Sequence, residues 1–216
     1  MARRLLPLLM VSLAALIVAA PPAHPQESGQ EILDKVRKKY DSVTDAEIWF
    51  TQRVKFSLSK AEETTSGTVL IKKEHKYRVE AGDQTIVTDG TTVWSYTASL
   101  HQVLIDHFKQ DERSLTPENL LLGASGGYTP IFIGKERVGK VEASLLKLTP
   151  KDEQSMVTGI RLWVDERDWT VKQVEVLDVN GKQTTYTVQQ LKLDVGLPDS
   201  RFTFQAPKGV DVVDLR

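Results

Sequence analysis

The chain has 216 residues, 40% hydrophobic and 26% charged, which is ordinary for one globular domain with or without a leader. Its formal net charge of −1 lacks the basic excess that nucleic-acid binding requires, so we expect no nucleic-acid partner. The sequence contains no cysteine, which excludes thiol catalysis, cysteine-bound metals, disulfides and a lipid-modified N-terminal cysteine.

The start of the chain has the features of a secretory leader. Two arginines precede an apolar run over Leu5–Ala20, and a proline-rich spacer follows over Pro21–Gln26. The apolar run is shorter than the roughly 20 residues that a membrane-spanning helix needs, so a cleaved signal peptide is favoured over an anchor. We therefore assign residues 1–26 to a signal peptide and spacer and residues 27–216 to one domain. A secreted chain without disulfides fits the bacterial periplasm.

An amphipathic helix is predicted directly after the spacer. Ser28 and Glu31 have the spacing of a capping box, and apolar residues recur at helical spacing from Ile32 to Tyr40. About three turns of helix are unstable alone, so we expect the apolar side to lie on another element.

Alternating strands follow this helix. Residues 46–58 alternate, with Phe50 on the apolar side. From Val69 to Val79 the odd positions are mostly apolar and the even positions are charged, which predicts one strand with two distinct faces. Asp89-Gly90 predicts a two-residue hairpin turn with positive φ at both positions. Residues 67–109 therefore read as a meander with one broad apolar face.

Two aromatic residues of this meander, Trp94 and Tyr96, are two positions apart and so share a face. After the meander, residues 115–123 combine a threonine N-cap, a proline at the first helical position and a closing glycine. This pattern predicts a short apolar helix that includes Leu121.

Strands return in the last third of the chain. They are predicted over residues 141–148, 160–165, 171–177 and 184–193. Asn180-Gly181 marks a hairpin turn, and the apolar parity switches between Val188 and Leu191, which predicts a bulge. Ten or eleven short strands linked by short turns predict a mainly β (α+β) fold with antiparallel pairing. A sheet of this size curls toward a barrel, and the two amphipathic helices would cover its apolar face.

No motif for catalysis or metal binding stands out. The pattern GxxxxGK occurs at residues 134–140, but Val141 and a predicted strand follow, so a polar hairpin turn is favoured over a phosphate-binding loop. His75 and His101 lack metal-binding spacing, and solvated strand positions are favoured for them. Asp165 and its acidic neighbours fit a solvated turn. We therefore expect no enzyme activity, no cofactor and no metal.

Lys73 is unusual because it falls on the apolar parity of its predicted strand. A charge at such a position is costly unless it is paired or reaches the rim. Two interpretations stay open: a lysine that extends to water at the sheet edge, or a polar group at the mouth of a hydrophobic cavity.

Taken in order along the chain, several short motifs resemble the LolA family, the periplasmic carriers of outer-membrane lipoproteins. The motifs are Phe50-Thr51-Gln52, Gly67–Lys73, Tyr77–Val79, Ile86–Tyr96 with Gln102-Val103, Leu148–Lys151, Asp178–Gly181 and Phe202–Val213. No single motif is specific, but the ordered set spans nearly the whole of the predicted domain.

The resemblance implies an unclosed antiparallel β-barrel with a lid of short helices over an apolar cavity. Such a protein binds lipoprotein acyl chains, receives its cargo from a LolCDE-type inner-membrane transporter and passes it to a LolB-type receptor where one is present. It would act as a monomeric periplasmic chaperone and not as an enzyme. The resemblance and the strand pattern together suggest eight lipid-binding or lid-control residues: Phe50, Ile71, Lys73, Tyr77, Val79, Trp94, Tyr96 and Leu121.

Two of these positions depart from the family pattern. The family typically has Arg-Pro where this chain has Lys73-Glu74, and the family arginine bonds the lid in the empty form. A lysine lacks the planar fork of arginine. The family often has phenylalanine at Tyr77.

Two other functions are compatible with a mainly β chain of this kind. A lipid-binding or sensor module that resembles the lipid-sensing domain of RseB-type regulators is the main alternative. A small outer-membrane barrel is disfavoured, because charged residues such as Lys72 and Arg78 would face lipid or crowd a narrow lumen.

Overall fold

The computed structural model of the protein describes residues 28–109, 116 and 127–216. The predicted signal peptide and spacer lie outside these residues, as does the predicted helix over 115–123 apart from Thr116. Within the described residues, no helix combines the length and apolar character needed to cross a membrane.

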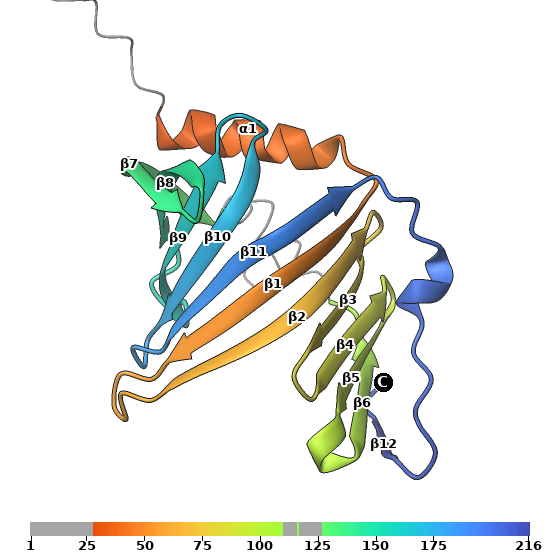
Figure 1. The fold of residues 1–216 in the computed structure, drawn as a ribbon. Coiled ribbons are helices and arrows are strands. Elements are labelled where there is room, and N and C mark those ends of the chain that lie inside the picture. Colours follow the sequence, from red (N-terminus) through yellow and green to blue (C-terminus); the bar gives the residue numbers. More distant parts are fainter. Residues whose placement is uncertain (1–27, 110–115, 117–126) are drawn as a thin grey trace, which may run out of the picture.

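The described residues form one curved sheet of twelve strands (Figure 1). The bounds are β1 Asp45–Lys55, β2 Glu62–Lys72, β3 Lys76–Ala81, β4 Gln84–Asp89, β5 Thr92–Thr97, β6 Gln102–His107, β7 Tyr128–Val138, β8 Val141–Pro150, β9 Val157–Asp165, β10 Thr170–Asp178, β11 Gln183–Leu193 and β12 Asp211–Asp214. Their order in the sheet is β12-β6-β5-β4-β3-β2-β1-β11-β10-β9-β8-β7.

The sheet is open because its first and last strands, β12 and β7, do not pair with each other. Neighbouring strands are antiparallel except for β12, which runs parallel to β6. The predicted mainly β fold and unclosed antiparallel barrel are therefore confirmed. The parallel strand at the edge was not predicted.

The predicted N-terminal helix is α1, Gly29–Asp41 (Figure 1). Its capping box is formed as expected: the Ser28 hydroxyl accepts from the Glu31 amide, and the Glu31 carboxylate accepts from the Ser28 amide at 2.7 Å. The predicted lid consists of two helices. The first is α1, and the second, over 115–123, lies outside the described residues apart from Thr116.

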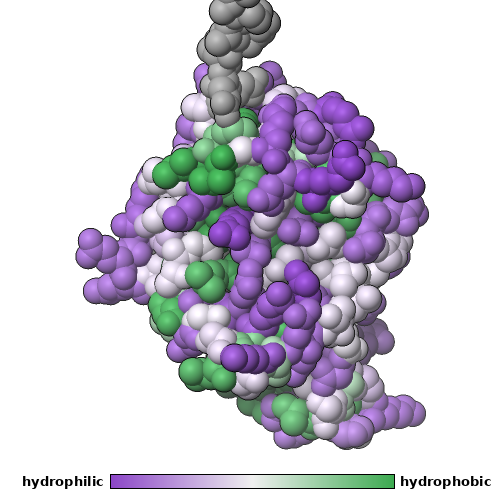
Figure 2. All heavy atoms as spheres, turned by 60° about the vertical axis from the view of Figure 1, so that its left-hand side comes forward, coloured by the Kyte–Doolittle hydropathy of each residue, from purple (hydrophilic) through white to green (hydrophobic). Residues whose placement is uncertain are grey.

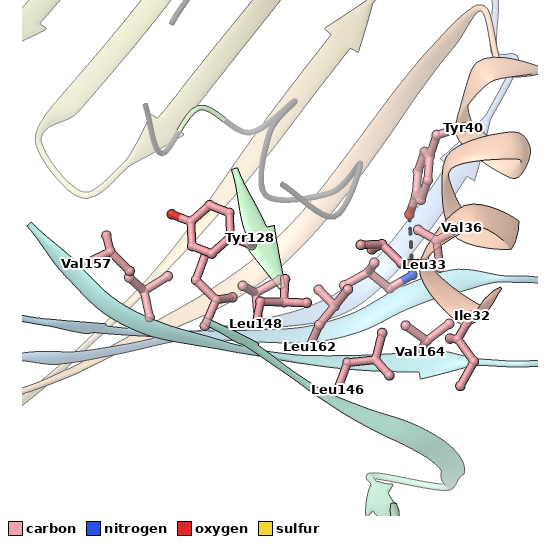
Figure 3. Packing of buried hydrophobic residues seen from close by; sticks show 14 residues of the cluster. Ile32, Leu33, Val36, Tyr40, Tyr128, Leu146, Leu148, Val157, Leu162 and Val164 are labelled. Carbon is pink, nitrogen blue, oxygen red and sulfur yellow. Dashed lines mark hydrogen bonds between the residues drawn. The ribbon is translucent and has the colours of Figure 1, made fainter. Parts of the chain in front are cut away.

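The apolar side of α1 packs on the inner face of the sheet. Figure 3 shows side chains of the helix meeting those of β8, β9 and β10. The Tyr40 hydroxyl accepts a 3.4 Å hydrogen bond from the Val171 amide, and burial raises the pKa of Tyr40 to about 12. The buried members of this core, which we call the helix-covered core, are Ile32, Leu33, Val36, Tyr40, Tyr128, Leu146, Leu148, Val157, Ile160, Leu162, Val164, Val171, Val174 and Val176.

The side of the molecule that carries β7, β8 and β9 differs from this interior. Figure 2 shows it as mainly hydrophilic, with hydrophobic residues in separate spots. The contrast follows from the alternation along each strand, which sends successive side chains to opposite faces.

The prediction of one continuous strand from Val69 to Val79 is wrong. The chain reverses at residues 73–75, where Glu74 and His75 adopt positive φ values of 68° and 60°. The turn separates β2 from β3, and Lys72 lies opposite Lys76. Because the loop holds three residues, the odd-numbered residues of β2 and β3 lie on the same face of the sheet. The alternation of apolar and charged residues therefore continues through the turn, and the sequence gives no sign of the break.

The two predicted hairpin turns are present, but their geometry differs from the prediction. At Asp89-Gly90 the last facing pair is Thr88 and Val93, so the loop has four residues, and only Gly90 among them has positive φ. The Asp89 carboxylate accepts hydrogen bonds from the amides of Thr91 and Thr92, which hold the loop in this conformation. At Asn180-Gly181 likewise only the glycine has positive φ.

Two smaller predictions are confirmed by the pairing of the strands. Phe50 faces Val188 while Trp49 faces Gln190, so one residue of β11 bulges where the parity switch was seen. The GxxxxGK pattern spans the end of β7 and a turn at Gly139, and β8 starts at Val141.

After β11 the chain crosses the outside of the sheet and returns to its far edge (Figure 1). We call residues 195–210 the strap. The buried carboxylate of Asp45 accepts hydrogen bonds from the amides of residues 195, 196 and 197 at 2.8–3.2 Å, which holds the start of the strap. Leu197 and Phe202 then pack on Leu70.

A charged cluster holds the strap at a second point. The Asp199 carboxylate accepts from the Lys72 ammonium at 2.6 Å and from the Lys76 ammonium at 3.0 Å. These two lysines face each other across β2 and β3 and would repel without an acid between them. Their hydrogen bonds hold the pKa of Asp199 below its usual range.

The acidic turn after β9 is not a simple solvated turn, as was expected for Asp165. The Asp165 side chain is buried and bonds Arg167 at 2.7 and 2.9 Å. The hydrogen bonds from Arg167 lower the pKa of Asp165 from its ordinary 3.8 to about 2. Lys172 lies 3.6 Å away and adds to the effect.

We expect Asp45→Ala to lower the free energy of unfolding by about 3 kcal/mol, because three backbone amides of the strap lose their acceptor. Urea denaturation measures this change. Asp41→Ala, at an exposed position of α1, is the control and should shift stability by less than about 0.5 kcal/mol. Equal stabilities of the two variants would contradict the role given to Asp45.

The Asp165 turn makes stability depend on acid pH. Because folding lowers this pKa from 3.8 to about 2, the ionised carboxylate stabilises the fold above pH 4, and that contribution is lost as the pH falls toward 2. Asp165→Asn should therefore be less stable than the parent at pH 5, with a gap that narrows toward pH 2. Urea denaturation at several pH values tests this, and a gap independent of pH would refute it.

Candidate functional site

A second apolar region of the inner face lies beside the helix-covered core, on β1, β2, β3 and β11. We call it the apolar patch. Its buried members are Ala46, Ile48, Phe50 and Val69, and its half-buried members are Ile71, Val79, Ala81, Tyr186, Val188, Leu191 and Leu193. It is therefore the part of the inner face with most half-buried apolar side chains.

The two regions differ in how completely they are buried. The helix-covered core has fourteen buried residues and two half-buried ones, whereas the apolar patch has four and seven. The cause is the position of α1, which packs against β7 and β10. Accessible apolar side chains on an inner face are what a binding site for apolar molecules requires.

The strand register joins four of the predicted site residues on this inner face. Phe50 belongs to the patch, and Ile71 and Val79 lie beside it on β2 and β3. Tyr77 faces Ile71 directly across the β2–β3 pair, and facing residues share a face. The structure therefore brings Phe50, Ile71, Tyr77 and Val79 together, and their lipid-binding role stays a prediction.

Trp94 and Tyr96 lie on the opposite, outer face, so the expectation of one broad apolar face for the meander is wrong. Tyr77 faces Thr88, and Thr88 faces Val93, which puts Val93 rather than Trp94 on the inner face. The strap covers this outer region, and the rings of Tyr96 and Phe204 lie 5.8 Å apart. The physical reason lies in the β3–β4 and β4–β5 loops, which contain two and four residues between the last facing pairs. A loop with an even number of residues switches the inward-facing positions between odd and even residue numbers.

The remaining two predicted residues lie elsewhere. Lys73 sits in the exposed β2–β3 turn, where its amide donates to the Thr44 carbonyl at 3.1 Å, so its predicted place on an apolar strand face is wrong. Any role for it in lid control stays a prediction. Leu121 lies outside the described residues.

Sequence reasoning missed the contribution of β11 to the patch. Tyr186, Val188, Leu191 and Leu193 line it opposite β1. The signal was present in the sequence: the apolar positions of residues 184–193 alternate on both sides of the predicted bulge. What it lacked was the pairing of β11 with β1, which joins distant parts of the chain.

Phe50 is held at the centre of the patch by close packing. Its ring lies 5.9 Å from that of Tyr186. A Cβ added to Gly67 would lie 2.7 Å from the tip of the Phe50 ring and 2.5 Å from the Glu80 carbonyl oxygen. The glycine therefore leaves the space that the Phe50 ring occupies.

One polar pair borders the patch. The Gln52 amide nitrogen donates to the Tyr186 hydroxyl at 3.3 Å, and burial raises the pKa of Tyr186. Within the described part of the chain, no cluster of three histidine, cysteine or acidic residues is placed to hold a metal ion. The chemistry available at the patch is apolar contact with a neutral hydrogen-bonding edge.

Comparisons with known proteins agree with this architecture. Residues 41–205 match the family model described as outer membrane lipoprotein carrier protein LolA. An outer-membrane lipoprotein carrier protein of Methylibium petroleiphilum is 28% identical over 206 residues, which cover 94% of this chain and 97% of that protein. One of Alkalilimnicola ehrlichii is 28% identical over 178 residues, which cover 81% of this chain and 80% of that protein.

A solved structure shares the fold. An uncharacterized conserved protein from Thermus thermophilus is similar with a TM-score of 0.58 and 20% sequence identity, over 86% of this chain and 98% of that chain.

We expect Gly67→Ala to lower the free energy of unfolding by about 2 kcal/mol, because the new methyl group displaces Phe50 or the β3 backbone. Gly159→Ala is the matched control, since a Cβ there would have only an ordinary contact of 3.8 Å. Chemical denaturation of both variants measures the difference. If Gly67→Ala is as stable as Gly159→Ala, the close packing of Phe50 on Gly67 is not a constraint.

Proposed function

Since the chain belongs to the LolA family of outer-membrane lipoprotein carrier proteins, we propose that it binds lipoprotein acyl chains and carries lipoproteins from the inner to the outer membrane. The observation that carries this proposal is the half-buried apolar patch on the inner face of the open sheet. Family membership supplies the cargo class, and the patch supplies a surface of matching chemistry.

The energetics of acyl-chain burial support binding at the patch. Each CH₂ group transferred from water to an apolar surface contributes about 0.8 kcal/mol. Half-buried side chains such as Val79, Val188 and Leu191 offer that surface without unfolding the helix-covered core. We propose that the helical lid and the acyl chains compete for it, so that the empty and loaded forms lie near balance.

We further propose the setting in which the protein acts. Residues 1–26 would be a signal peptide and spacer that deliver the domain of residues 27–216 to the periplasm. Cargo would come from a LolCDE-type inner-membrane transporter and leave to a LolB-type receptor where one is present, with the carrier acting as a monomer. The names of the relatives are those of carriers, which favours a binding protein over an enzyme.

A release assay tests the carrier function. The mature protein is added to spheroplasts that hold a labelled outer-membrane lipoprotein, and the soluble fraction is examined for a complex. ATP-dependent release that requires this protein supports the proposal. If the folded protein releases no lipoprotein but carries a different lipid, detected by mass spectrometry, the carrier function is refuted in favour of the lipid-binding or sensor module.

The patch itself is tested by Val79→Asp. A carboxylate on the inner face would have to lose water when an acyl chain binds, so we expect at least tenfold weaker binding of a fluorescent fatty-acid probe. Leu58→Asp is the control, because Leu58 is an apolar side chain that is 96% exposed in the β1–β2 turn. Circular dichroism checks that both variants fold. Unchanged probe affinity in folded Val79→Asp would rule out the patch as the binding site.

A further inference from the structure

The inner face changes from apolar to polar along β1, and the strand register shows where. At the end of the sheet near the start of β1, the facing residues Leu191, Ile48 and Val69 are all apolar. Phe50 and Val188 form the next row. The row after that consists of Tyr186, Gln52 and Thr65, which we call the polar row.

Two side chains of the polar row, Gln52 and Tyr186, keep hydrogen-bond donors that the bond between them does not use. Gln52 donates one of its two amide hydrogens to the Tyr186 hydroxyl oxygen at 3.3 Å, and this bond uses neither the hydroxyl hydrogen of Tyr186 nor the second amide hydrogen of Gln52. For the described residues, the structure shows no other partner for these two groups. Tyr186 and Gln52 are both half-buried, and a polar group that is removed from water gains when it finds a hydrogen-bond partner.

The charge around the polar row decides which ligand group fits it. Among the described inner-face positions of β1, β2 and β11, the charged side chain is that of Glu63, one row beyond Thr65. A negative neighbour disfavours a carboxylate or phosphate at this place. A neutral acceptor, such as an ester carbonyl, fits the free Tyr186 hydroxyl.

We propose that the polar row binds the ester carbonyls of a diacylglyceryl lipid whose acyl chains lie on the apolar patch. This inference rests on the proposed function and adds the orientation of the cargo: the chain ends point toward the start of β1, and the glyceryl group lies at the Tyr186–Gln52–Thr65 row. Phe50 lies at the boundary, packed against Tyr186 on its polar side. Tyr186 and Gln52 are then residues that determine specificity for esterified lipid.

The test compares two ligands that differ only in the carbonyl groups. One is a synthetic peptide with a dipalmitoylglyceryl-cysteine, and the other has two hexadecyl ether chains on the same peptide. Calorimetric titration of the parent protein should show tighter binding of the ester. Tyr186→Phe and Gln52→Leu should each weaken ester binding about fivefold to tenfold and leave ether binding unchanged, because one hydrogen bond is lost.

Tyr96→Phe is the matched control, because it removes a phenol hydroxyl from the outer face. It should leave both affinities at the parent values. Equal loss of ester and ether binding in Tyr186→Phe, or no loss of either, would overturn the role of the polar row while leaving the carrier function in place. If the parent protein binds neither lipid, the proposed function and this inference both fall.

Discussion

The central constraint of this fold is that its sheet is far wider than its helix is long. A helix of 13 residues is about 20 Å long, whereas twelve strands about 4.8 Å apart extend over more than 50 Å. One such helix covers about four strands, and α1 packs against β7 and β10. The rest of the inner face needs other cover, and it is there that apolar side chains remain half-buried.

The outer face of the sheet also carries apolar side chains that need cover, and the strap covers those on β2 to β5. The strap crosses β2 to β6 and contains a short 3-10 helix at Asp199–Phe202, and Leu197 and Phe202 pack on Leu70. Two polar contacts fix its path: the Asp45 carboxylate on three successive amides, and the bond of Asp199 to two facing lysines. Because the strap lies on the outer face, it does not cover the apolar patch on the inner face.

Local sequence signals predicted the local features well. The capping box of Ser28, the bulge of β11 and the glycines of two hairpins follow from rules that act within a few residues. The turn at residues 73–75 was missed because its odd length leaves the alternation of apolar residues unbroken.

Features that join distant segments could not be predicted in this way. The pairing of β1 with β11, the parallel placement of β12 and the path of the strap depend on contacts between residues about 110 to 150 positions apart. The placement of Trp94 and Tyr96 is an intermediate case. Counting the parity through the two even-length loops would have separated them from Tyr77, because two reversals return the inner face to odd-numbered positions.

The three-residue loop between β2 and β3 has a consequence for how this fold can evolve. It sets the phase of the strands that follow, from β3 to β6. Gain or loss of a single residue there would turn Tyr77 and Val79 outward and bring charged Arg78 inward. Length changes at this point are therefore compatible with the fold in steps of two residues.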